Sequence, residues 1–174
     1  GAPRERQQEW FQENGPETPG LLDHLRAHGK DFDLVLFYTF RYFPSYFGLP
    51  LVADRAVLIP TAEEDSAIDL DVLPEFFDRP AGYVFMTPEE QKLVASRALH
   101  ALPPSVVSGI GLEPAPTERP SRAPLASLGI PPSYLLYLGR VDRNKGCDAL
   151  LENFQEFATT RKDVTLVLAG PAKM

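Results

Sequence analysis

The stretch Tyr134-Leu135-Leu136-Tyr137-Leu138-Gly139-Arg140-Val141-Asp142-Arg143-Asn144-Lys145-Gly146 is the most informative about the fold, because an apolar strand runs directly into a loop with two glycines and three cations. The next residues have apolar side chains at the spacing of one helix face, at Cys147, Leu150, Leu151, Phe154, Phe157 and Ala158. Residues 164–169 then have the composition of a second buried strand. Residues 134–169 are therefore predicted to form a βαβ unit.

The loop of this unit is a candidate anion site. In βαβ units, ligands bind outside the carboxyl end of the strand, where the first helical amides and the helix dipole attract negative charge. Arg140 and Lys145 lie in that loop. A guanidinium pairs with phosphate oxygens in a bidentate manner, and an ammonium group adds a mobile point charge. We therefore predict a phosphate site, the alternative being a solvated loop whose cations only promote solubility.

Two common phosphate-binding motifs do not fit this loop. A Walker A motif requires Ser or Thr after Gly-Lys, whereas here Lys145 precedes Gly146 and Cys147 follows. No G-x-G-x-x-G follows a predicted strand, so the dinucleotide-binding fingerprint is absent too.

The order strand, Gly-Arg, polar segment, Lys-Gly, helix and strand ending Leu-Ala-Gly resembles the start of the nucleotide-binding domain of retaining GT-B glycosyltransferases, the group called family 4 or group 1. The resemblance implies an α/β fold with a Rossmann-like parallel sheet and flanking helices. It implies that Gly139, Arg140, Lys145 and Gly146 bind the diphosphate of a nucleotide-sugar donor. It also implies metal-independent sugar transfer to a hydroxyl of a glycan or lipid, with no further cofactor.

Upstream of this unit, short apolar strands alternate with helical stretches, as in a parallel sheet with right-handed crossovers. The strands are predicted at 34–38, 56–59, 83–86 and 105–108. Helices are predicted near 21–29, 71–78 and 88–102, and residues 41–47 as a helix or loop. Thr87-Pro88-Glu89-Glu90 is predicted to open the third helix with a capping box.

The chain is predicted to hold pieces of two domains. Residues 113–132 contain six of the 18 prolines and are predicted to be an interdomain linker. Residues 1–112 would be the late part of the acceptor-side domain, since "DLVLFYTF", "VLIPTAEED" and "VVSGIGLEP" resemble that region of the family. Residues 133–174 would be the first βαβ unit of the nucleotide-binding domain, whose exposed sheet edge is expected to pair with a second copy.

Other polar residues are weaker candidates. Glu63, Glu64 and Asp65 follow a predicted strand and could act in acid/base work, or could form an exposed acidic turn. Thr39, Arg41 and Tyr42 could face an acceptor cleft or be structural. His24 and His28 have metal-ligand spacing but no third ligand, so they and His100 are expected at the surface, with no metal site.

The catalytic residues stay unknown. The family carries an E-x7-E element late in its nucleotide-binding domain. Glu5 and Glu13 have that spacing here, but they lie in a polar stretch without a preceding strand. The chain, which lacks an initiating Met and ends at Lys173-Met174, is therefore expected to be an inactive fragment of an active parent. The rival hypothesis is a non-enzymatic α/β module that binds a phosphorylated small molecule or a protein, with six predicted strands that could form one sheet.

Composition agrees with a globular domain. The 174 residues are 44% hydrophobic and 24% charged, without an apolar run of membrane-spanning length or a signal-peptide core. A net charge of −7 argues against nucleic-acid binding. The single cysteine, Cys147, fits a reducing compartment such as the cytoplasm, and its place on the apolar helix face predicts a packed thiol.

Overall fold

Runs of β-branched and aromatic residues form four parallel strands in the first part of the chain, in the spatial order β1-β2-β3-β4. Their bounds are Val35–Tyr38 for β1, Ala56–Ile59 for β2, Gly82–Phe85 for β3 and Ser105–Val107 for β4. Two further parallel strands, β5 (Tyr134–Leu138) and β6 (Thr165–Ala169), form a second sheet. The predicted α/β class with parallel sheets is confirmed.

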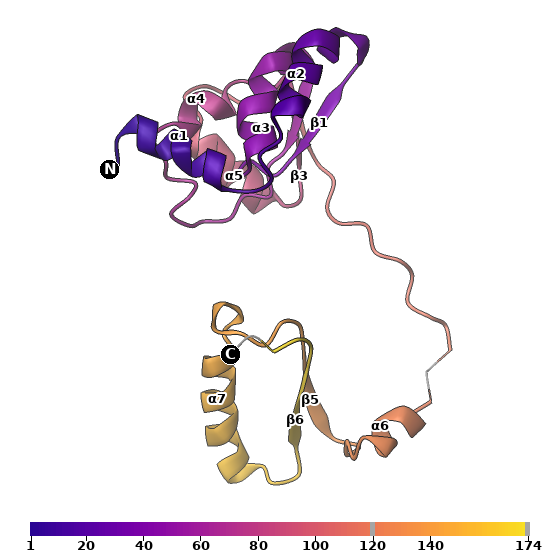
Figure 1. The fold of residues 1–174 in the computed structure, drawn as a ribbon. Helices are drawn as coiled ribbons and strands as arrows, with labels where there is room; N and C mark the ends of the chain where they lie inside the picture. Colours follow the sequence, from indigo (N-terminus) through magenta and orange to yellow (C-terminus); the bar gives the residue numbers. More distant parts are fainter. Residues whose placement is uncertain (119–120, 173–174) are drawn as a thin grey trace. The chain divides into compact units, whose positions relative to one another are not determined.

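The computed structural model describes residues 1–118 and 121–172, in two compact units, Gly1–Glu113 and Pro114–Met174 (Figure 1). Two residues of the predicted linker, Arg119 and Pro120, lie outside the described residues, as does the chain end Lys173-Met174. The two sheets belong to different units, so the six predicted strands do not form one sheet.

Two helices, α1 (Arg4–Glu13) and α2 (Pro19–His28), and the 3-10 segment η1 (Gly29–Asp31) precede β1 in the first unit. The strands that follow are connected by α3 (Phe43–Gly48) with the 3-10 segment η2 (Leu49–Arg55), by α4 (Leu73–Phe77) and by α5 (Pro88–Arg97). Large aromatic side chains form much of the core, among them the fully buried Phe40, Phe77 and Phe85. The Phe40 and Phe77 rings meet edge to face with centroids 5.6 Å apart, a favourable aromatic geometry.

Helix α1 is not apparent in the hydrophobic pattern, because its sequence is mostly polar. Two side chains hold it to the rest of the unit. Phe11 is completely buried and stacks on Tyr46 with ring centroids 3.9 Å apart. Gln7 is also buried, and its amide donates to an Asp71 carboxylate oxygen at 2.9 Å and accepts from the Val72 amide at 3.3 Å. The N-terminal segment is therefore part of the folded unit.

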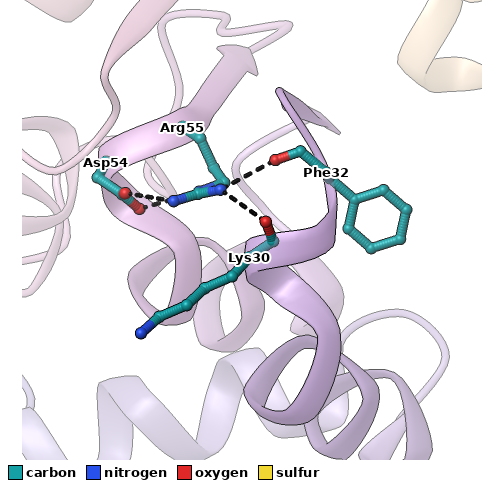
Figure 2. A network of polar contacts seen from close by, with 4 residues as sticks. All are labelled: Lys30, Phe32, Asp54 and Arg55. Carbon is teal, nitrogen blue, oxygen red and sulfur yellow. Dashed lines mark hydrogen bonds and ion pairs between the residues drawn. The ribbon is translucent and has the colours of Figure 1, made fainter.

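Arg55 joins the start of β2 to the segment that leads into β1 (Figure 2). Its guanidinium donates to the carbonyls of Lys30 and Phe32 at 3.2 and 3.0 Å, and it pairs with the Asp54 carboxylate at 2.8 Å. The hydrogen bond from Arg55 lowers the pKa of the Asp54 carboxyl. Carbonyls at the amino-terminal edge of the sheet thus receive a charged donor.

The start of α5 only half follows the predicted capping box. Thr87 is the N-cap and its hydroxyl accepts from the Glu90 amide at 3.0 Å, as predicted. The Glu90 carboxylate does not return to Thr87; its two oxygens accept from Ala62 at 2.8 Å and Met86 at 2.6 Å. Glu90 therefore ties together the ends of β2 and β3. The helix ends at Arg97, earlier than the predicted residue 102.

The second unit contains the predicted βαβ arrangement, in which η3 (Arg143–Lys145) and α7 (Cys147–Thr160) lie between β5 and β6. The predicted linker also contains a short helix, α6 (Ala123–Ser127), which its proline content conceals. Cys147 is fully buried, which confirms the packed thiol. The expectation of buried strands is wrong for both strands of this unit. Leu135, Leu136 and Leu138 of β5 are exposed, and no residue of β6 is buried. Parallel strands are buried when helices cover both faces of their sheet, whereas α7 is the one α-helix that the described chain places between β5 and β6.

Candidate functional site

The loop after β5 is held by close contact with the end of β6. The amides of Gly139 and Val141 donate to the carbonyls of Ala169 and Pro171, each at 2.9 Å. Gly170 has φ 148°, and a Cβ on it would lie 1.9 Å from the Gly139 carbonyl oxygen. No rearrangement of a side chain could relieve that overlap, because the obstacle is backbone. The strand ending in Ala169-Gly170 thus needs glycine there to let the two loops meet.

Asp142 organises the cations of the loop. Its carboxylate is mostly buried and lies 2.6 Å from Nε of Arg140. The same carboxylate accepts from the Lys145 amide at 2.9 Å, as the N-cap of η3. A single acidic side chain therefore positions both residues that the sequence singles out as phosphate ligands. The signal available in the sequence was Asp three residues before Lys145, a pattern typical of a capped turn.

Gly146 turns the chain from this loop into α7. It has φ 71°, in the left-handed region that favours glycine. The Cys147 side chain then enters the interior, and the Cys147 amide donates to the Asp142 carbonyl at 3.4 Å. Arg140 and Lys145 consequently lie between the carboxyl end of β5 and the amino-terminal end of the 14-residue α7.

Carboxylates offset two of the three positive charges of the loop. Arg140 pairs with Asp142, and Arg143 pairs with Asp148 in the first turn of α7 at 3.1 Å. Among the described residues, Lys145 forms no ion pair. An anion at this loop would therefore meet the ammonium group of Lys145 directly and a guanidinium already held by a carboxylate.

Tyr137 contacts the backbone of the loop through its hydroxyl group. Its hydroxyl donates to the Arg140 carbonyl at 2.7 Å. A hydrogen bond with Cys147, together with burial, raises the pKa of the Tyr137 hydroxyl to about 12. The hydroxyl hence stays protonated, and available as a donor to Arg140, at any physiological pH. Nothing in the sequence pattern distinguished Tyr137 from the other apolar residues of the strand.

A second polar region lies at the carboxyl ends of the strands of the first unit. Thr39 and Thr61, the residues after β1 and just beyond β2, have φ of 64° and 49°. Such left-handed conformations are uncommon for β-branched residues and collect at functional sites. A groove of about 400 Å³ lies here, lined by Tyr38, Thr61, Ala62, Glu63, Met86, Thr87, Glu90 and Ile110.

The candidate residues of this edge do not converge as a catalytic cluster. Glu63 lines the groove, whereas Asp65 pairs with Arg41 at 2.5 Å. Burial raises the pKa of the Asp65 carboxyl, but the hydrogen bonds from Arg41 and Ala67 outweigh it, so the net pKa is lowered. Glu64 is exposed. The acidic turn thus contains one groove carboxylate and one structural ion pair.

The remaining candidates have structural surroundings. Thr39 is buried, and Tyr42 lies against Gly15. His24 and His28 are neighbours on the exposed side of α2, with ring centroids 4.8 Å apart, and His100 contacts Asp78.

The part of the chain that the structure describes contains no group of three or more potential metal ligands. Glu5 and Glu13, which have the E-x7-E spacing, both lie on α1, where Glu13 pairs with Arg6 at 3.6 Å.

Comparison of the sequence with protein-family models and with curated proteins finds no match. Each helix in residues 1–118 and 121–172 is too short or too polar to cross a lipid bilayer.

Proposed function

We propose that this chain is part of a retaining, metal-independent glycosyltransferase, and that the loop from Gly139 to Gly146 binds the diphosphate of a nucleoside-diphosphate sugar. The observation that carries the proposal is the position of Arg140 and Lys145 between the end of a parallel strand and the start of a long helix. Ligands of parallel sheets bind at this place, and helix N-termini attract phosphate.

The chemistry of the loop suits a departing diphosphate. Negative charge grows on the diphosphate as the bond to the sugar breaks, so donors that are already positioned lower the barrier. Asp142 holds Nε of Arg140, which leaves the terminal nitrogens as donors, and it shapes the turn that carries Lys145. Charge-assisted hydrogen bonds of this kind contribute about 1.5–3 kcal/mol each.

The proposal also covers the acceptor of the sugar and the cellular compartment of the reaction. The acceptor would be a hydroxyl of a glycan or lipid, and the reaction would take place in the cytoplasm. Glu63, in the groove of the first unit, is the carboxylate best placed to contact a hydroxyl-bearing ligand there.

Binding of UDP, GDP and pyrophosphate, measured by titration calorimetry or NMR, tests the diphosphate site. Arg140→Ala and Lys145→Ala should each weaken binding about tenfold or more, which corresponds to one lost charge-assisted hydrogen bond. The matched control is Arg143→Ala, which removes the same charge from the same loop but from a side chain that is 86% exposed and paired with Asp148.

The control separates a built site from general attraction between opposite charges. Equal weakening in all three variants, or unchanged binding in Arg140→Ala and Lys145→Ala, would contradict the proposal. Binding of pyrophosphate but of no nucleotide would favour the rival hypothesis of a module for small phosphorylated ligands.

A further inference from the structure

The helices of the first unit border a cavity that the proposed function does not use. Its volume is about 290 Å³, at the lower end of the range for small-molecule sites. Its lining comes from α1, α3, η2 and α4, together with the residues Val72 and Arg79 on either side of α4. All of these elements belong to Gly1–Glu113, so the cavity is independent of the loop proposed to bind a diphosphate.

Aromatic side chains form the apolar part of this cavity. Tyr46, Phe47 and Phe76 all line it. The Tyr46 ring stacks on the Phe76 ring with centroids 5.6 Å apart, and it meets the Phe47 ring edge to face at 5.0 Å. Because rings in contact fix one another's orientation, this surface is formed before a ligand arrives, and it suits a flat apolar group.

Helix α1 supplies a polar wall of the cavity. Arg4 and Gln8 are one turn apart and both line the cavity, so they share a face of the helix. The Arg4 guanidinium pairs with the Glu75 carboxylate at 2.9 Å and donates to the Asp71 carbonyl at 3.4 Å. Near the other end of α1, the buried Phe11 holds the helix to the core. Contacts near both ends of α1 therefore fix this wall in place.

The charges of the lining favour an anion. The guanidinium groups of Arg4 and Arg79 and the carboxylate of Glu75 line the cavity, so its net charge is positive although the chain has a net charge of −7. Arg79 is exposed and forms no ion pair with any residue in the described ranges. Burial raises the pKa of the Tyr46 hydroxyl and outweighs the lowering effect of the charges on Arg4 and Arg79. The hydroxyl therefore stays protonated at neutral pH and can donate a hydrogen bond.

We propose that this cavity binds a small aromatic carboxylate, with the ring against Phe47 and Phe76 and the carboxylate on the Arg79 guanidinium. A free guanidinium binds a carboxylate through two parallel hydrogen bonds. The ring covers apolar surface that an inorganic anion would leave exposed, so the ring supplies affinity and the carboxylate fixes the orientation. The cavity takes such an acid whether or not the loop from Gly139 to Gly146 binds a nucleotide sugar.

Titration of the whole chain with 2-naphthoate, followed by NMR, tests the site. The amide signals of α1, α3 and α4 should shift and saturate. Arg79→Ala should weaken binding about tenfold, which corresponds to one lost charge-assisted hydrogen bond. The Arg79 side chain is exposed, so this variant should stay folded. Glu75→Gln should tighten binding about twofold or more, because it removes a negative charge beside the ligand and releases Arg4.

Arg26→Ala is the matched control variant, since Arg26 is an exposed arginine of α2 that pairs with Asp23 outside the cavity. It should leave the affinity unchanged. 2-Naphthamide keeps the rings without the charge and acetate keeps the charge without the rings, so each should bind about tenfold more weakly or worse than 2-naphthoate.

Several results would overturn the proposal. These are equal affinity for 2-naphthamide and 2-naphthoate, equal affinity for acetate and 2-naphthoate, equal weakening in Arg79→Ala and Arg26→Ala, weaker binding in Glu75→Gln, shifts confined to the strands of the sheet, and the absence of saturable binding.

Discussion

At the scale of single residues, the two buried acidic side chains, Glu90 and Asp142, act mainly as hydrogen-bond acceptors for backbone amides. Glu90 accepts two backbone amides at the ends of β2 and β3, and Asp142 accepts the Lys145 amide while it holds Arg140. Both carboxylates are mostly buried. Each satisfies donors that would otherwise be left without a partner where a strand ends and a helix begins.

Replacement of Glu90 should show the strength of this role. Glu90→Ala would leave the half-buried amides of Ala62 and Met86 without their acceptors, so we expect the free energy of unfolding to fall by about 2–4 kcal/mol. Glu90→Gln, which keeps one acceptor oxygen, should lose less. Urea unfolding of the purified variants measures both changes.

Glu89→Ala is the matched control, because Glu89 precedes Glu90 in the same helix turn and is exposed. Its loss should cost no more than about 1 kcal/mol, the usual value for an acidic side chain near a helix N-terminus. Similar losses in Glu89→Ala and Glu90→Ala would show that helix electrostatics, rather than the two amides, explain the effect.

At the scale of elements, α1 shows how a mostly polar segment can join a core through a few side chains. Phe11 is fully buried against Tyr46, whereas most of the helix is exposed. Isolated helices of this length are marginal in water, so α1 depends on its contacts with the rest of the unit.

Phe11→Ala should release α1 from the unit. A buried Phe truncated to Ala costs about 3–5 kcal/mol, more than a 10-residue helix can recover by itself. Hydrogen exchange of the α1 amides should become fast, while the amides of β2 and β3 stay protected. Gln12→Ala, at the exposed neighbouring position, should leave α1 protected; slow exchange of α1 in Phe11→Ala would contradict this account.

At the scale of the whole molecule, the two units differ in how much they bury. The large core cluster lies in Gly1–Glu113, whereas the buried apolar side chains in the described part of the second unit are only Val141 and Cys147. Small units with little buried apolar surface are marginally stable.

Unfolding in urea should therefore occur in two steps, the second unit first. Far-UV circular dichroism should show both steps. Fluorescence of the single tryptophan, Trp10 on α1, should follow only the later one. Cys147→Ala should shift the earlier step alone, because it creates a cavity only in the second unit. One transition, coincident for both probes, would show that the units unfold together.

Much of the element order was predictable because it rests on local patterns. The strand at residues 56–59 has the predicted bounds, and the βαβ unit around Gly139 to Gly146 was recognised from its apolar spacing. Elements without a strong pattern were missed, namely the polar α1 and the proline-containing α6. The candidate site was predicted as far as Arg140 and Lys145, but Asp142 and Tyr137 were not, because their importance depends on which atoms they reach.

The sequence alone determined the α/β class and the order of strands and helices, since hydrophobic spacing and turn residues act over a few neighbours in the chain. Only the tertiary structure decided that the strands form two sheets, that Gly170 meets the Gly139 carbonyl, and that Glu90 joins two strand ends. These features depend on contacts between residues far apart in the sequence. The exposure of Leu36 and Tyr38 on one face of the first sheet has the same origin, because it follows from the spatial order of the strands, which no local pattern encodes.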